Sequence, residues 1–219
     1  MTLDQAIVAY KQFYGEKSYN DNNYFRDHNI VPDTYMTRLA NRVKKIHDKH
    51  PDVFSNKRIL DIGANNGDQS FILDRMGNVV TSFDINDFIL MFLEDNLPDG
   101  DIVNTIDKVK EKSYDTVFCS SVINLQAKPY EWFESLFDID FKTLVLIYHD
   151  GYTHPINQTA KQYSPDGLSG NSSLVEKSAL LEVCNRLGLN VIDSDLTWQD
   201  NVAIDGIEYK QTALVVEKT

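Results

Sequence analysis

Apolar and polar positions over the first 55 residues predict two helices joined by a loop. Thr2 is the expected N-cap of the first helix, because a hydroxyl there can accept a hydrogen bond from the first turn. Residues 15–29 are polar and rich in Asn, Asp and Tyr, which predicts a loop. The apolar positions that recur at roughly helical spacing in the first helix are Leu3, Ile7, Val8 and Phe13.

The second predicted helix runs over 33–49, after Pro32 and before Pro51. Its expected apolar stripe is Tyr35, Leu39, Val43 and Ile46. Arg42, Lys44 and Lys45 lie beside Asp48 on the same helix, and we expect them to form its solvated face.

From residue 57 onward the pattern alternates between strand and helix. Apolar runs predict strands at 58–62, 78–83, 116–120 and 143–148. Amphipathic segments predict helices at 69–76, 87–95, 130–137 and 174–187. Residues 191–194 and 209–217 predict two last strands with no helix between them, so these should pair antiparallel. The order predicts an α/β fold whose mostly parallel sheet ends in an antiparallel strand pair.

Composition narrows the function classes. The 219 residues carry a formal net charge of -12, which is opposite to the charge that phosphate binding favours. The charge therefore favours a small molecule or a basic partner and disfavours a nucleic acid without excluding it. No apolar run approaches the roughly 20 residues of a membrane-spanning helix, so we expect no membrane association. The sequence makes no prediction about the oligomeric state.

The cysteines and the N-terminus indicate the compartment. Cys119 and Cys184 have no metal-binding or redox spacing and lie in apolar surroundings, which predicts buried thiols in a reducing cytoplasm. Residues 1–10 carry Asp4 and lack a basic segment, so they do not look like a signal peptide.

Candidate chemistry begins where the strand at 58–62 ends. The residues from Asp61 onward run Asp-Ile-Gly-Ala-Asn-Asn-Gly, with glycines at 63 and 67, before a predicted helix. Such a turn lets a ligand approach the backbone and presents free amides at a helix N-terminus. In open α/β sheets, ligands bind at this edge.

Asp84 follows the next predicted strand and is the second element of the candidate site. Its carboxylate could accept hydrogen bonds from both hydroxyls of a ribose. The alternative is that Asp84 caps the following helix. Asn65 has alternatives as well, because it could line the ligand or serve only the turn. Together these residues indicate a site for an adenosine-type ligand.

These residues resemble the class I S-adenosylmethionine-dependent methyltransferases, whose first motif is an acidic residue, any residue and then Gly-x-Gly-x-Gly. Asn65 replaces the middle glycine, and asparagine tolerates a left-handed conformation. The Gly-Ala-Asn sequence is also similar to that of FkbM-type methyltransferases. The resemblance covers about residues 57–219 and implies a Rossmann-like fold with a seven-stranded sheet and S-adenosylmethionine as cofactor.

The resemblance also implies roles for single residues. Asp61 would order the turn and lie near the methionine amino group, Asp84 would hold the ribose, and Ile85 would pack on the adenine. Asn104 or Asp107 could contact the adenine amino group. The other implied cofactor-binding residues are Gly63, Ala64, Asn65, Gly67, Ser120 and Ser121.

The acceptor side is less defined. His149 and His154 follow the strand at 143–148, and an imidazole has the ordinary pKa range for a general base. Their spacing with Asp150 is weak for a metal site, and we predict none. Residues 151–173 form a long polar segment that predicts a functional loop.

We therefore expect a methyltransferase domain over 56–219 and an N-terminal helical extension over 1–55 that acts as a lid or docking element. The expected reaction is methyl transfer to oxygen or nitrogen of a small molecule. Alternatives are a binding or regulatory protein of the same fold without catalysis, or an enzyme that methylates protein or RNA. A nicotinamide-dependent oxidoreductase is disfavoured because Asn65 and Asp68 occupy positions where its fingerprint needs glycine.

Overall fold

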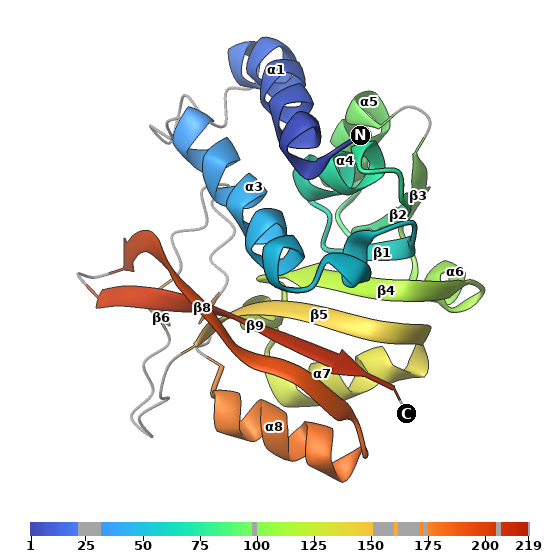
Figure 1. The fold of residues 1–219 in the computed structure, drawn as a ribbon, viewed down its shortest axis with the longest axis vertical. Coiled ribbons are helices and arrows are strands. Elements are labelled where there is room, and N and C mark those ends of the chain that lie inside the picture. Colours follow the sequence, from blue (N-terminus) through green and yellow to red (C-terminus); the bar gives the residue numbers. More distant parts are fainter. Residues whose placement is uncertain are drawn as a thin grey trace. The chain divides into compact units, whose positions relative to one another are not determined.

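The fold is a mixed α/β sheet, seen in a computed structural model that describes residues 1–21, 32–97, 100–150, 160–161, 171–172, 175–204 and 207–218. The seven strands across the sheet are β3 (Asp101–Val103), β2 (Val79–Phe83), β1 (Arg58–Ile62), β4 (Ser113–Ser120), β5 (Asp140–Asp150), β9 (Ile207–Glu217) and β8 (Asn190–Ile204) (Figure 1). The pairs β1–β2, β2–β3 and β4–β5 are parallel, whereas β9 pairs antiparallel with both β5 and β8. The predicted parallel sheet with an antiparallel end is confirmed.

The chain divides into two compact units, Met1–Lys108 and Val109–Thr219. Beside β1 to β3, the first unit contains α1 (Leu3–Asp21), α3 (Pro32–Lys49), η1 (Pro51–Phe54), α4 (Asp68–Arg75) and α5 (Asp87–Asn96). The short helix α6 (Ile106–Lys110) spans the boundary between the units. The second unit adds η2 (Ile123–Leu125), α7 (Pro129–Ser135), η3 (Leu136–Asp138), α8 (Lys177–Arg186) and the short pair β6 (Ala160–Lys161) and β7 (Asn171–Ser172). The predicted boundary at residue 55 falls inside the first unit, and the role of residues 1–55 remains a prediction.

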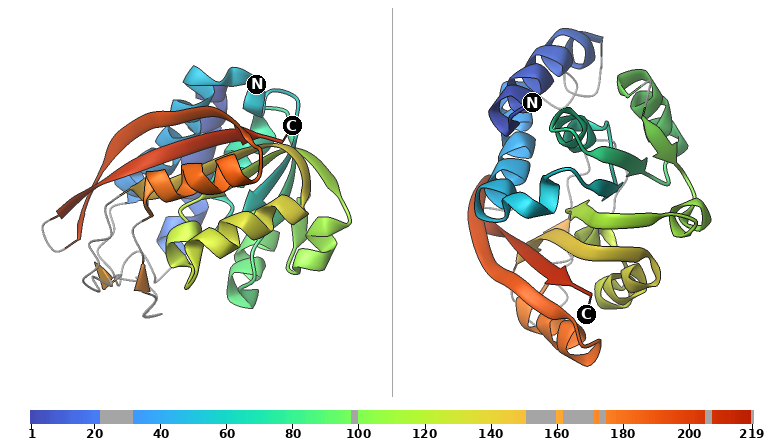
Figure 2. Two further views of the ribbon diagram at one scale, coloured as in Figure 1. Left: turned by 90° about the horizontal axis from the view of Figure 1, so that it is seen from below. Right: turned by 45° about the vertical axis from the view of Figure 1, so that its right-hand side comes forward.

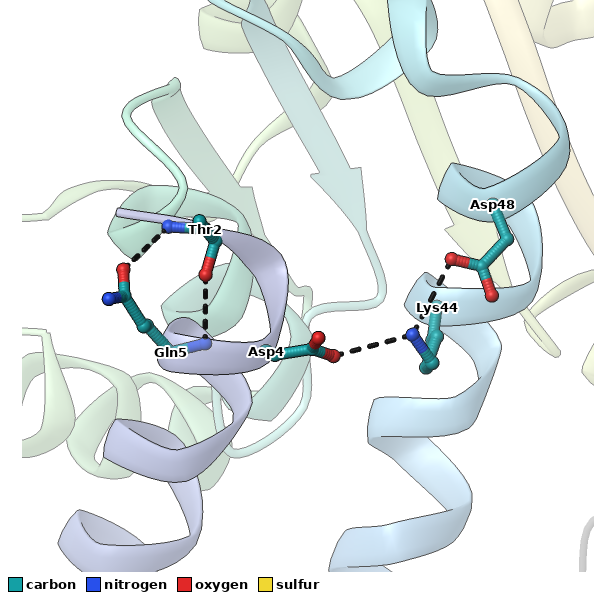
Figure 3. Close-up of polar contacts among 5 residues, drawn as sticks. All are labelled: Thr2, Asp4, Gln5, Lys44 and Asp48. Carbon is teal, nitrogen blue, oxygen red and sulfur yellow. Dashed lines mark hydrogen bonds and ion pairs between the residues drawn. The ribbon is translucent and has the colours of Figure 1, made fainter.

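Helix α1 begins with the predicted cap. The Gln5 amide donates to Thr2 Oγ1 at 3.3 Å, and the Thr2 amide donates to Gln5 Oε1 at 2.9 Å (Figure 3). This reciprocal pair satisfies amides that the first turn cannot satisfy itself. The helix continues to Asp21, so residues 15–21 are helical where a loop was expected, because one glycine inside a helix costs only about 1 kcal/mol.

The buried face of α1 differs from the predicted stripe. Val8 is 66% exposed and lies off the buried face, although its spacing put it among the apolar positions of the helix. The buried positions are Leu3, Ala6, Tyr10 and Tyr14. Apolar spacing missed this face because two of its members are tyrosines, whose hydroxyl groups usually need a hydrogen-bond partner when they are buried.

Helix α3 buries Leu39, Val43 and Ile46 as predicted, whereas the side chain of Tyr35 lies outside the described residues. Arg42 is only 6% exposed, so its predicted place on the solvated face is wrong. It lies three residues after Leu39 and four before Ile46, and the helix turn therefore puts it on the buried side.

The exposed side of α3 connects to α1. Lys44 Nζ lies 3.3 Å from Asp4 Oδ1 of α1 and 3.5 Å from Asp48 Oδ1 one turn along α3 (Figure 3). Helices α1, α3 and α4 all contact one another within the first unit.

The core of the second unit is the paired centre of β5 and β9. Residues 144–148 and 211–216 are buried, and α7 lies beside α8 (Figure 2). Cys119 and Cys184 are buried and unbridged, as predicted. The predicted elements differ from the observed ones at their ends, most of all in β8, which is longer than the predicted strand at 191–194. The pattern did not indicate β3, α6 or the short pair β6 and β7, which lie in polar stretches.

The described part of the chain has neither a membrane-spanning helix nor a cluster of metal ligands. None of its helices has an apolar stretch long enough to cross a bilayer. Within the same residues, no group of three His, Cys, Asp or Glu side chains is placed to hold a metal ion.

Candidate functional site

The loop between β1 and α4 has the left-handed backbone that its sequence predicts. Gly63, Asn65 and Gly67 have φ angles of 71°, 50° and 82°. Asparagine at the middle position therefore takes the conformation that glycine would take, which explains why this departure from three glycines is tolerated.

The sequence predicted free backbone amides in this loop, but the structure shows them hydrogen-bonded. The Gly63 and Ala64 amides both donate to the Phe83 carbonyl, at 2.8 and 3.1 Å. The Asn65 amide donates to Asp84 Oδ2 at 3.1 Å. The tight turn folds back onto the end of β2, and its amides are used there. A ligand at this loop would thus meet side-chain acceptors instead of these amides.

Asp84 is fixed at the end of β2 by two backbone donors. In addition to the Asn65 amide, the Asn86 amide donates to Asp84 Oδ1 at 3.0 Å. Helix α5 begins at Asp87, so Asn86 and not Asp84 is the residue directly before it. The two bonds orient the carboxylate, and each oxygen keeps a further lone pair for another donor.

Asp61 lies at 2% exposure behind the loop. Ser70 donates its hydroxyl hydrogen to Asp61 Oδ2 at 2.6 Å and accepts one from Ser82 at 2.8 Å. Burial raises the pKa of the Asp61 carboxyl to about 7, with smaller contributions from the charges of Asp84 and Asp68 and against the Ser70 hydrogen bond. A cation near this carboxyl would favour its ionised form.

Asn104 and Ile85 lie at the same edge of the first unit. Phe83 pairs in register with Val103, so Asp84 and Asn104 follow neighbouring positions at the carboxyl ends of β2 and β3. Ile85 is 80% exposed, and Asn104 is exposed too. The first unit thus brings together Asp61, the glycine loop, Asp84 and Asn104. Asp107 is exposed on α6.

The second unit gathers its own predicted residues at the carboxyl ends of β4 and β5. Ser120 ends β4, and Ser121 follows with a φ of 64°. Gln211 of β9 is fully buried, and its Nε2 lies 3.4 Å from Ser121 Oγ and 3.2 Å from His149 Nε2. The Gln211 amide therefore joins a serine and the candidate base.

The backbone of His149 is also held. Its amide donates to Asn124 Oδ1 at 3.0 Å, and Asn124 Nδ2 donates to its carbonyl at 3.4 Å. The buried side chain of Asn124 thus holds the end of β5 in place. His154 and most of the predicted loop at 151–173 lie outside the described residues, so their roles stay predictions.

Comparison with known proteins gives a match in structure only. No protein-family model and no curated protein matches the sequence. Magnesium protoporphyrin IX methyltransferase from Synechocystis PCC 6803, solved with bound S-adenosylmethionine, is similar with a TM-score of 0.60 and 13% identity, over 95% of this chain and 89% of that chain. A cyclopropane-fatty-acyl-phospholipid synthase-like protein from Lactobacillus casei ATCC 334 is similar with a TM-score of 0.60 and 14% identity, over 98% and 100%.

The chain has the class I methyltransferase fold. The cyclase SpnF shares this methyltransferase fold, with a TM-score of 0.61 and 9% identity over 82% of this chain and 81% of that chain. Its name states another reaction, so the reaction of this chain has to be argued from its own site.

Several polar residues that make hydrogen bonds around the candidate site were not singled out by the sequence pattern. They are Tyr10, Tyr14, Ser70, Ser82, Asn96, Asn124 and Gln211. Ser82 and Gln211 could have been noticed in the sequence, because each is a polar residue within or beside a strongly apolar strand. Tyr10 and Tyr14 could have been noticed as well, since a spacing of four residues puts both on one helix face.

Proposed function

We propose that the chain binds S-adenosylmethionine and transfers its methyl group to an oxygen or nitrogen of a small molecule. The observation that carries the proposal is the Asp84 carboxylate, held by the Asn65 and Asn86 amides at the edge of the sheet beside a left-handed turn. A fixed carboxylate with unused lone pairs suits the two hydroxyls of a ribose.

The other residues of the first unit fit the same cofactor. The exposed Ile85 offers an apolar surface to the adenine, and Asn104 offers an amide to its polar edge. Asp61 would face the methionine amino group, and its raised pKa would fall when that cation binds. The structures of similar fold solved with S-adenosylmethionine or S-adenosylhomocysteine support this choice.

The cofactor supplies an activated methyl group on a sulfonium, so the chain has to position the acceptor and take up its proton. We assign proton uptake to His149, with Ser120 and Ser121 beside the methionine part of the cofactor. Gln211 Nε2 lies against His149 Nε2 and holds the ring in one orientation, so this contact has to open before that nitrogen takes up a proton. His154 remains the second candidate base.

A second candidate function is cofactor binding without methyl transfer. It is favoured by the contact between His149 Nε2 and Gln211 Nε2, because an engaged ring nitrogen is not available to an acceptor in that arrangement. The two functions differ in whether S-adenosylhomocysteine is formed when an acceptor is supplied. We propose a small molecule as the acceptor. We also propose that the protein works in the cytoplasm, because its unbridged cysteines fit a reducing compartment.

The test is calorimetric titration of the purified protein with S-adenosylmethionine and, separately, with NAD. We expect micromolar binding of S-adenosylmethionine alone, lost in Asp84→Ala because the ribose acceptor is removed. Asp74→Ala is the matched control, since Asp74 is an exposed aspartate on α4. Absence of binding by the wild-type protein would refute the proposal, and retained binding by Asp84→Ala would refute the role of Asp84.

A further inference from the structure

The buried face of α1 ends in two tyrosines that contact the glycine loop and its helix. Tyr10 is fully buried, and its hydroxyl donates to Asp68 Oδ1 at 2.6 Å. Tyr14 is 1% exposed, and its hydroxyl donates to the Asn66 carbonyl at 2.8 Å. These two bonds join α1 to residues on both sides of Gly67.

Helix α5 holds the loop from another direction. Asn96 Nδ2 donates to the same Asn66 carbonyl at 3.0 Å. A Cβ built on Gly67 would lie 2.9 Å from Leu93 Cδ2, 3.1 Å from Leu97 Cδ1 and 3.3 Å from Tyr14 Oη. The loop is therefore enclosed between α1 and α5. A larger residue at 67 would push Leu93 aside and would be strained by the φ of 82°.

The rings of the two tyrosines also pack with one another and with α4. The Tyr10 and Tyr14 centroids lie 5.0 Å apart, and Phe71 lies 6.5 and 5.8 Å from them. Replacing either tyrosine by phenylalanine keeps this aromatic packing and removes only the hydroxyl. The hydrogen bonds can therefore be tested apart from the packing.

We propose that Tyr10 and Tyr14 are positioning residues for the cofactor: they hold residues 66–68 so that the left-handed turn and Asp84 keep the geometry that accepts S-adenosylmethionine. The inference rests on the proposed function. It assigns α1 to the cofactor site as a buried support, in place of the lid or docking element expected from the sequence. Coupling of this kind is reciprocal, so cofactor binding should in turn stabilise the packing of α1 against the glycine loop.

The test compares Tyr10→Phe, Tyr14→Phe and the double variant with the wild-type protein by calorimetric titration with S-adenosylmethionine. We expect the dissociation constant of the double variant to rise by about tenfold or more, and smaller rises in the single variants. Tyr114→Phe is the matched control, since it removes a hydroxyl that donates to the Val109 carbonyl in the second unit. Lys44→Met is a second control, since it removes the exposed ion pair between α3 and α1 without touching the loop.

Hydrogen exchange supplies a measurement that a purely structural role would not move. In the wild-type protein, S-adenosylmethionine should slow exchange of the α1 amides, and this effect should vanish in the double variant. Circular dichroism before titration checks that each variant is folded. If the double variant does not fold, the two single variants are compared with the wild-type protein instead.

The outcomes separate the two claims. Wild-type affinity in a folded double variant would overturn the positioning role and leave the proposed function intact. No binding by the wild-type protein would overturn the proposed function, and the inference with it. A loss of affinity equal in Lys44→Met and the double variant would also overturn the inference, because it would show a general effect of loosening α1.

Discussion

At the scale of single residues, the site depends on polar groups whose surroundings fix their state. Asp84 is oriented by two backbone amides, whereas Asp61 is buried behind them with one serine hydroxyl as its close donor. The two carboxylates are therefore suited to different tasks. Asp84 is placed to accept hydrogen bonds from a ligand, and Asp61 is placed to respond to a nearby positive charge.

The affinity for S-adenosylmethionine should increase as the pH rises from about 5.5 to 7.5. Burial raises the pKa of Asp61 to about 7, so below that pH the free protein holds a proton that a bound cation would displace, and above it the pH dependence of binding levels off. Binding that releases a proton strengthens with pH, by at most about tenfold per unit. Calorimetric titration at several pH values measures the dependence.

The Asp61→Asn variant should bind more weakly at pH 7.5 and show a flatter pH profile, because it has no proton to release. Asp74→Asn serves as the control for losing one negative charge from the first unit. A wild-type profile that Asp61→Asn leaves unchanged would show that Asp61 only orders the turn.

At the scale of elements, α1 is held at its start and along its buried face. The capping box of Thr2 and Gln5 starts the helix, and Tyr10 and Tyr14 join its far side to the glycine loop. The ion pair between Lys44 and Asp4 is exposed, and exposed pairs contribute little because water and salt screen them. The cap and the tyrosines should therefore matter more than the charges.

We expect Thr2→Ala to lower the free energy of unfolding by about 1 kcal/mol, since it removes the side-chain acceptor of the first turn. Lys44→Met should change it by less than about 1 kcal/mol. Urea unfolding followed by circular dichroism measures both. If Thr2→Ala is the milder of the two, the capping box does not stabilise α1 as the hydrogen bonds indicate.

At the scale of the whole molecule, the chain encloses acidic groups although its formal net charge is already -12. Asp68 is 3% exposed, and burial raises the pKa of its carboxyl from 3.8 to about 6 in spite of the hydrogen bond from Tyr10. A raised pKa means that the folded protein holds this proton more tightly than the unfolded chain. The stabilisation is complete below about pH 4 and is lost as the pH rises through 6.

The wild-type protein should therefore lose stability relative to Asp68→Asn between pH 4 and 6, by up to about 1.4 kcal/mol per pH unit. Asparagine keeps an oxygen that can accept from Tyr10 and does not ionise. Urea unfolding at several pH values measures the difference, with Asp74→Asn as the exposed control. A difference that is constant with pH would contradict the buried, neutral state of Asp68.

The alternation of strands and helices was determined by the sequence alone, because burial of both faces of a sheet requires apolar runs separated by amphipathic helices. The turn at residues 63–67 and the acidic residue at 84 were equally apparent, since glycine and asparagine are the residues that adopt left-handed φ angles without a large penalty. The short β3 was not apparent, because three residues in a polar stretch carry no periodic pattern.

The partners of the buried polar groups were decided only by the tertiary structure. Tyr10 lies 58 positions before Asp68, and Gln211 lies 62 positions after His149, so no local pattern connects them. The same holds for Arg42, which local charge placed on the surface and the turn of α3 buried. Periodicity reports how much of a segment is buried, whereas the hydrogen-bond partner of a buried group depends on which distant segment packs against it.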